Sequence, residues 1–196
     1  MAEVELPNPE ELEERRDKSF SRRIALVTAV YAVVLAIASL GGNNAMKEML
    51  LAQQEASNQW SYYQAKVIRE HLNRGNKLVL ELQLAEPSAL KGPERDKHEA
   101  LARKFADEEK RMNADKKEIE PKAKAAEAAR DLHQAKDPYF DYAEVLLQIA
   151  IVCSSVSILA GSRPMFWFSS TLAVLGSLLT VNGFFLLLRV PFFHGH

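Results

Sequence analysis

The chain has little of what catalytic and metal-binding sites require. Its 196 residues include one cysteine, Cys153, so a disulfide framework and a multi-cysteine metal site are excluded. It has no phosphate-binding glycine loop, no dinucleotide-binding glycine motif, no zinc-binding His-Glu-x-x-His and no nucleophile-elbow serine. Its formal net charge of -1 offers no basis for binding nucleic acid. We therefore expect a protein that is not an enzyme, holds no cofactor or metal and has no nucleic-acid partner.

Charge is nearly absent from three apolar stretches. A membrane-spanning helix needs roughly 20 apolar residues, and the predicted spans are residues 24–42, 143–161 and 165–188. The second contains 17 uncharged residues, Val145 to Gly161, and the third has aromatic clusters at both ends, as interfacial belts do. Only residues 162–164 join the last two spans, which predicts a tight helical hairpin.

Charge is instead concentrated in the central 100 residues, 43–142, which contain 18 Lys or Arg and 18 Asp or Glu. Two helical arms are expected here, residues 43–85 and 94–136, because helix breakers gather only between them. These breakers are Pro87, Gly92 and Pro93. The fold class is therefore all-α: a polytopic membrane protein with three transmembrane helices and a long antiparallel coiled-coil-like hairpin between the first and second.

Two further prolines predict interruptions of the second arm. Pro121 predicts a kink or break, and Asp137-Pro138 predicts the end of the arm, because proline removes a backbone donor and clashes with the preceding turn.

Positive charge close to the first span predicts the topology. Five basic residues precede the span and only Lys47 closely follows it, so the N-terminal segment 1–23 is expected to be cytoplasmic. The hairpin and the tail, residues 189–196, are then extracytoplasmic. A cleavable signal peptide is the alternative, since Ala36-Ile37-Ala38 matches a cleavage site. The long acidic segment before the span and its full length favour an uncleaved anchor in an inner membrane.

A four-three spacing of apolar residues predicts a seam in each arm. The first arm offers Ala45, Met49, Ala52, Ala56, Trp60, Tyr63 and Val67. The second arm offers Leu101, Phe105, Met112, Ile119 and Ala126, with polar residues at most alternate positions. Ion pairs one turn apart support this second helix; the expected pairs are Glu99 with Arg103, Asp107 with Arg111, and Glu120 with Lys124.

Small residues recur at spacings of three and four within the spans. The first has Ala25, Ala29, Ala32, Ala36 and Ser39; the second has Ala150, Ser154, Ser157 and Gly161; the third has Ser169, Ala173, Gly176, Thr180 and Gly183. Such faces allow close backbone approach and interhelical hydrogen bonds, which drive helix association in lipid. The alternative is that small residues are simply common in such helices.

One segment of the first arm carries a family resemblance. Ala56 to Lys66 reads ASNQWSYYQAK, between LLAQQE and IREHL. With the N-terminal span and the C-terminal helix pair, this segment resembles the bacterial family catalogued as domain of unknown function 4337, over almost the whole chain. The resemblance implies a bacterial membrane protein with this helical layout, no assigned activity and no catalytic residue.

Four residues are candidate partner or packing contacts. Trp60 and Tyr63 fall on the first seam, which favours core packing, whereas Tyr62 lies off it and is the better candidate for contacting a partner. Asn182 is the strongly polar residue deep in a span; an interhelical hydrogen bond is one explanation, and a polar pore or quinone contact is the other. Neither Cys153 nor the histidines form a predicted site. These histidines are His71, His98, His133, His194 and His196.

These observations favour a non-enzymatic, membrane-anchored structural or interaction protein. It would assemble as a homo-oligomer through its helices, with the lipid bilayer around it, and present the hairpin to protein partners. An accessory subunit of a larger membrane complex, for secretion, transport or respiration, is the alternative. An oligomeric pore is a third hypothesis.

Overall fold

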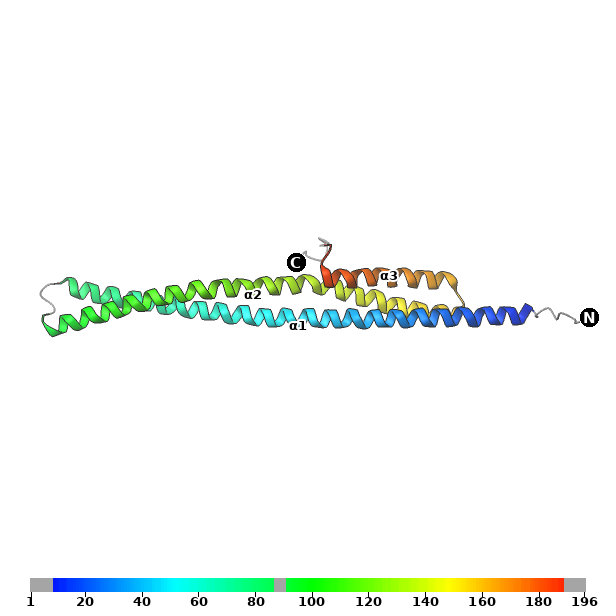
Figure 1. Ribbon diagram of the computed structural model, residues 1–196, viewed down its shortest axis with the longest axis horizontal. Helices are drawn as coiled ribbons and strands as arrows, with labels where there is room; N and C mark the ends of the chain where they lie inside the picture. The colour runs from blue at the N-terminus through cyan, green and yellow to red at the C-terminus, as the bar shows by residue number, and fades with distance from the viewer. Residues whose placement is uncertain (1–8, 87–90, 189–196) are drawn as a thin grey trace, which may run out of the picture. The chain divides into compact units, whose positions relative to one another are not determined.

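The computed structural model describes residues 9–86 and 91–188. It consists of three long helices packed antiparallel (Figure 1): α1 spans Pro9–Ala85, α2 spans Pro93–Ala160 and α3 spans Arg163–Phe185. The predicted all-α class is confirmed. Each of the three helices is long and apolar enough to cross a membrane, judged by length and composition.

The two long helices are less interrupted than their prolines predict. α2 continues through both Pro121 and Pro138, so Pro121 does not break the helix and the expected end at Asp137-Pro138 is wrong. The reason is the packing of residues beside each proline. Ile119 and Ala123 are buried around Pro121, and Tyr139 is buried directly after Pro138. These contacts hold the helix together although each proline removes one backbone hydrogen bond.

The chain divides into two compact units. The first, here called the bundle, comprises Met1–Glu48 and Leu132–His196; the second, here called the hairpin, comprises Met49–Asp131. In the bundle all three helices contribute, and the turn from α2 to α3 consists of Gly161 and Ser162. Gly161 has φ +60°, a conformation that favours glycine, and this permits the predicted tight turn.

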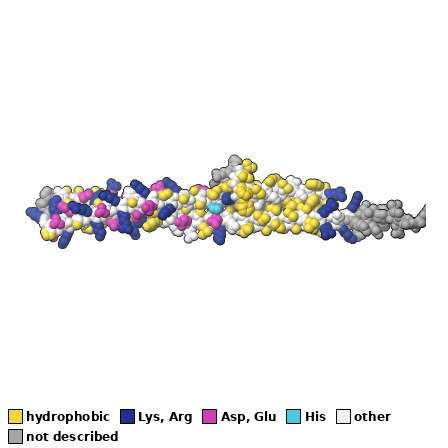
Figure 2. Space-filling model, in the orientation of Figure 1, with side chains coloured by type: hydrophobic (Ala, Val, Ile, Leu, Met, Phe, Trp, Pro, Cys, Tyr) yellow, Lys and Arg dark blue, Asp and Glu magenta, His cyan; other side chains and the backbone are white. Residues whose placement is uncertain are grey.

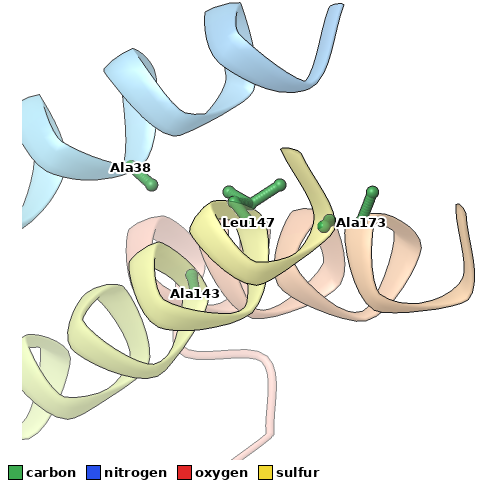
Figure 3. Close-up of a cluster of buried hydrophobic side chains, with 5 residues drawn as sticks. Ala38, Ala143, Leu147 and Ala173 are labelled. Atoms are coloured by element: carbon green, nitrogen blue, oxygen red, sulfur yellow. The ribbon is translucent and has the colours of Figure 1, made fainter. Parts of the chain in front are cut away.

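The core of the bundle is made of small side chains. Ala38 of α1, Ala143, Leu147 and Ala150 of α2, and Ala173 of α3 form one buried cluster, and Figure 3 shows the three helices meeting around Leu147. The small-residue face predicted for the third span is buried throughout: Ser169, Ala173, Gly176, Thr180 and Gly183. In the second span, Ala150, Ser154 and Ser157 are buried, and Gly161 is exposed at the turn.

The face named for the first span does not pack within the chain, and whether it meets another copy stays a prediction. Ala25, Ala29, Ala32 and Ala36 are exposed, while Ile24 and Ala38 are fully buried. The physical reason is helical phase. Because α1 is one unbroken helix, the four-three spacing that includes Ala45 continues backwards through Ala38 and Tyr31 to Ile24. The row of alanines lies on a different face.

The seam predicted for the first arm is observed within the hairpin. Ala56 is buried, and Met49, Ala52, Trp60, Tyr63 and Val67 are half-buried. In the second arm, Met112 and Ile119 are buried, Phe105 and Ala126 are half-buried, and Leu101 is exposed. Figure 2 shows the contrast in surface chemistry: side chains of the bundle are mainly hydrophobic, whereas those of the hairpin are mixed with both signs of charge.

Candidate interaction surfaces

Ion pairs cross the seam of the hairpin. Lys66 Nζ lies 2.6 Å from Asp115 Oδ2, and Lys77 Nζ lies 3.0 Å from Glu109 Oε2. A third pair joins Lys116 to Glu70. Lys66 is buried although its side chain is charged, because Asp115 accepts its hydrogen bond. The hairpin therefore aligns its arms with polar contacts as well as apolar ones.

The Lys66–Asp115 hydrogen bond shifts both groups in the direction that keeps them charged. The pKa of Lys66 is raised by this bond, with a further contribution from Tyr62. The pKa of Asp115 is lowered by the same bond. Lys66 Nζ also lies 5.0 Å from the centre of the Tyr62 ring. Both shifts favour the paired, folded arrangement across the neutral pH range.

Charged pairs within the second helix follow the predicted spacing only in part. Lys124 pairs with Glu120 at 2.6 Å, as expected. Glu99 pairs with Arg95 instead of Arg103, and Arg111 approaches Glu108 instead of Asp107. On a helix each of these residues has alternative partners three and four positions away, so spacing alone does not choose between them.

Trp60 and Tyr63 lie on the seam and contact each other. Their rings meet edge to face at 5.5 Å between centroids, and the Trp60 Nε1–H group donates a hydrogen bond of 2.8 Å to Glu127 Oε1. Both side chains are half-buried. The indole thus has its polar group satisfied within the hairpin, which is the arrangement expected of a core aromatic residue. Tyr62 is 52% exposed and lies off the seam.

A second apolar stripe runs along the outer face of α1 in the hairpin. It comprises Ala65, Ile68, Leu72, Gly75, Val79 and Leu82. Its large members are more than half exposed, from 54% for Val79 to 74% for Leu82. The spacing is again four and three, displaced by two positions from the inner seam. We call this set the outer stripe. Sequence reasoning missed it because it followed only one phase of the heptad.

The three helices of the bundle meet around Phe140. This α2 ring is fully buried between Gly41 of α1 and Gly183 of α3, and a methyl group added at either glycine would fall within 3.0 Å of the ring. The Phe184 ring packs edge to face on it, at 5.0 Å between centroids. These two glycines therefore allow the backbones of α1 and α3 to approach the aromatic ring closely.

Hydroxyl groups connect every pair of helices in the bundle. Thr28 Oγ1 and Ser154 Oγ lie 2.5 Å apart between α1 and α2, and the Tyr31 hydroxyl donates to Ser170 Oγ of α3 at 2.9 Å. Ser169 Oγ of α3 donates to the Ala150 carbonyl of α2 at 2.6 Å. The predicted interhelical hydrogen bonds are thus present, and two of them use buried residues of the small faces.

Asn182 makes its side-chain hydrogen bonds at the end of its own helix, so the interhelical bond expected of it is not observed. Its Nδ2 donates to the Leu188 carbonyl at 2.8 Å, and its Oδ1 accepts from the Leu188 backbone N–H at 2.8 Å. Leu186, in a left-handed conformation, donates its N–H to the Asn182 carbonyl. The residue does not bridge two helices. It folds the chain back at the end of α3, where its amide both donates to and accepts from the Leu188 backbone.

The described residues contain no group of three or more histidine, cysteine or acidic side chains that could hold a metal ion. Cys153 is half-buried on α2, and His71, His98 and His133 lie at separate places along the two long helices. His194 and His196 lie outside the described residues.

Residues 20–186 match the family described as "Domain of unknown function (DUF4337)". No curated protein matches the chain. No solved structure matches it either.

Proposed function

The chain belongs to the DUF4337 family, and from that premise we propose that it is a non-enzymatic structural protein of the bacterial inner membrane. The bundle anchors it through three membrane-spanning helices, with the N-terminus in the cytoplasm. The hairpin extends on the extracytoplasmic side and pairs with the hairpin of a second copy. The outer stripe of α1 is the observation that carries this proposal.

The outer stripe has the chemistry of an unfilled coiled-coil seam. A monomeric soluble surface rarely exposes a continuous row of large apolar side chains, and such rows mark interaction sites. Here the row keeps the seven-residue period that lets one helix pack along another. α1 thus carries one seam facing α2 and a second seam, on nearly the opposite side, without a partner in the described chain.

A second copy suits this stripe because copies inserted in one membrane share one orientation. Their α1 helices would run parallel, and like positions of the stripe would face each other. The flanking positions then bring Gln64 opposite Arg69, and His71 opposite Asn76. Charges of the same sign do not meet. Tyr62, at the edge of the stripe, would lie at the rim of such an interface.

The hydrogen bonds of Asn182 weaken the pore hypothesis. Both ends of this amide bond the backbone of Leu188, so the side chain serves to end α3. Thr180 likewise donates to the Gly176 carbonyl at 2.9 Å. These polar groups therefore have structural partners within the chain, which weakens the case that they line a lumen.

Cysteine cross-linking tests the pairing directly. In a Cys153→Ser background, Leu72→Cys places a thiol on the outer stripe, and a disulfide forms only where two Cα atoms come within about 7 Å. We expect oxidation in native membranes to give a species of twice 22.0 kDa. The matched control is Arg74→Cys, which is exposed two residues away and off the stripe.

Two results would contradict the proposal. Equal cross-linking of both variants would show random collision instead of a specific interface. Cross-linking of Leu72→Cys to a different protein would identify an accessory subunit of a larger complex, which was the alternative from the sequence. A reporter inserted at Gly92 that is active only in the cytoplasm would overturn the proposed topology separately.

A further inference from the structure

A small pocket lies in the bundle, just beyond the apolar stretch 24–42. All three helices line it, with a volume of about 130 Å³. Its floor is apolar, made by Gly41, Phe140 and Phe184. Its polar lining consists of Asn44 and Glu48 from α1 and of His133 and Lys136 from α2. Ligand pockets for drug-sized molecules are several times larger, so this one suits a single small polar group.

The four polar residues have hydrogen-bonding capacity to spare. Within the described chain, none of the side chains of Asn44, Glu48, His133 and Lys136 makes a hydrogen bond or an ion pair. This differs from the hairpin, where Lys66, Lys77 and Lys116 all pair with acids across the seam. A lysine, a glutamate, a histidine and an asparagine thus surround one apolar floor without bonding one another.

The position of the pocket along the helices adds a second constraint. Gly41 and Asn44 lie at the end of the first predicted span, and Gly183 and Phe184 lie near the end of α3. Phe185 and Leu187, which follow Phe184 in the chain, are more than 70% exposed. If the bundle crosses the membrane as proposed above, these residues lie where acyl chains give way to headgroups.

We propose that this pocket binds the headgroup of a phospholipid that carries a primary ammonium, a phosphoethanolamine. The phosphate oxygens accept hydrogen bonds from the Lys136 ammonium and from His133. The lipid ammonium donates to the Glu48 carboxylate and to the Asn44 side-chain carbonyl. The acyl chains lie along the exposed apolar surface near Phe184. This inference rests on the proposed membrane insertion and does not depend on pairing of the hairpins.

The presence of both a basic and an acidic side chain favours phosphoethanolamine over the phosphoglycerol and phosphocholine headgroups. An anionic phosphoglycerol headgroup satisfies Lys136 but leaves the Glu48 carboxylate without a cation. A phosphocholine headgroup carries a bulky quaternary ammonium that cannot donate a hydrogen bond to Glu48 or Asn44. The phosphoethanolamine headgroup supplies both an acceptor for Lys136 and a donor for Glu48.

Native mass spectrometry of the full chain tests the proposal. The protein is released from detergent in an equimolar mixture of phosphatidylethanolamine, phosphatidylglycerol and phosphatidylcholine with identical acyl chains. We expect phosphatidylethanolamine to be retained several-fold more than the other two, at one per chain. Glu48→Gln should abolish that preference, and Lys136→Gln should lower retention of every phospholipid. Lys47→Gln is the control, since this exposed residue does not line the pocket.

Equal retention of the three lipids by the unaltered chain would overturn the proposal, as would equal losses for Lys136→Gln and Lys47→Gln. Far-ultraviolet circular dichroism of each variant separates lost binding from lost folding. The same spectra report the number of chains. Monomers that retain phosphatidylethanolamine would contradict the pairing of hairpins while supporting the pocket, and dimers without lipid preference would do the reverse.

Discussion

The hairpin and the bundle use the same helical spacing with opposite chemistry. In both, a four-three row of residues on one helix faces a neighbouring antiparallel helix. In the hairpin this row contains Lys66, Glu70 and Lys77, each joined to a charge on the other arm. In the bundle the corresponding rows contain alanine, glycine and serine. The comparison shows that helical phase decides which positions face the neighbouring helix. Whether those positions hold charged or small residues differs between the hairpin and the bundle.

On the proposed membrane insertion of the bundle, the difference follows from the source of the free energy of helix association. In water, apolar burial drives packing and charged residues can remain at a seam if they are paired and partly hydrated. In lipid, apolar burial between helices gains nothing, so close contact and hydroxyl hydrogen bonds must supply the attraction. Several bundle hydroxyls also satisfy themselves on the preceding turn, as when Ser177 donates to the Ala173 carbonyl at 2.7 Å. This keeps polar groups tolerable in an apolar helix.

The largest expected effect comes from removing the ring at the centre of the bundle. Phe140→Ala should destabilise the bundle by about 3 kcal/mol, near the lower end of core Phe-to-Ala values, because in the proposed membrane setting lipid already solvates apolar groups. Detergent unfolding followed by circular dichroism measures it. Phe185→Ala is the control, since Phe185 is 71% exposed. A similar loss for both variants would show that the ring contributes by size alone and not through its packing between glycines.

A pair of glycine substitutions sharpens the comparison further. Gly41→Ala adds a methyl group in collision with the Phe140 ring and should cost about 1–3 kcal/mol. Gly75→Ala, in the hairpin, adds a methyl group with nothing within 4 Å and should stabilise the helix by about 0.5–1 kcal/mol. Thermal unfolding should therefore show a lower midpoint for Gly41→Ala and a higher midpoint for Gly75→Ala than for the unaltered chain. The same sign for both would mean that glycine at Gly41 does not serve close packing.

The fold was largely predictable from the sequence because the spacing of apolar residues and the length of the uncharged stretches determine most of it. Three apolar helices, a tight turn before α3 and the first-arm seam all follow from them. The face that α1 buries within the chain did not, because it follows the phase set by Ala45 further along the same helix and not the row of alanines. The continuity of α2 at Pro121 also did not, since the compensating contacts of Ile119 and Ala123 are tertiary.

The candidate surfaces were less predictable for a different reason. The outer stripe could have been found by testing a second heptad phase, since Ile68, Leu72, Val79 and Leu82 keep the period. The pocket could not, because Glu48 and Lys136 are far apart in the sequence and meet only through the register of two helices. The role of Asn182 likewise depends on where α3 ends, which no local pattern fixes.

The smallest expected effect tests whether the charged seam stabilises the hairpin at all. Lys66→Met removes the partner of Asp115 and should lower the hairpin's thermal midpoint near pH 7 by less than either bundle substitution. The sign of the pH dependence follows from the two pKa shifts. Asp115 has a pKa below its ordinary 3.8, so its contribution is present above 3.8 and disappears as pH falls through the lowered value.

Lys66 has a pKa above its ordinary 10.5, so its contribution is present below 10.5 and disappears as pH rises through the raised value. The difference between the unaltered chain and Lys66→Met should therefore be constant across the neutral range and shrink at both extremes. Lys124→Met is the matched control, because Lys124 pairs with Glu120 on its own helix and not across the seam. A difference in thermal midpoint that does not change with pH would mean that Lys66 stabilises the seam through its aliphatic stem. The hairpin would then resemble the bundle in relying on side-chain packing more than on charge.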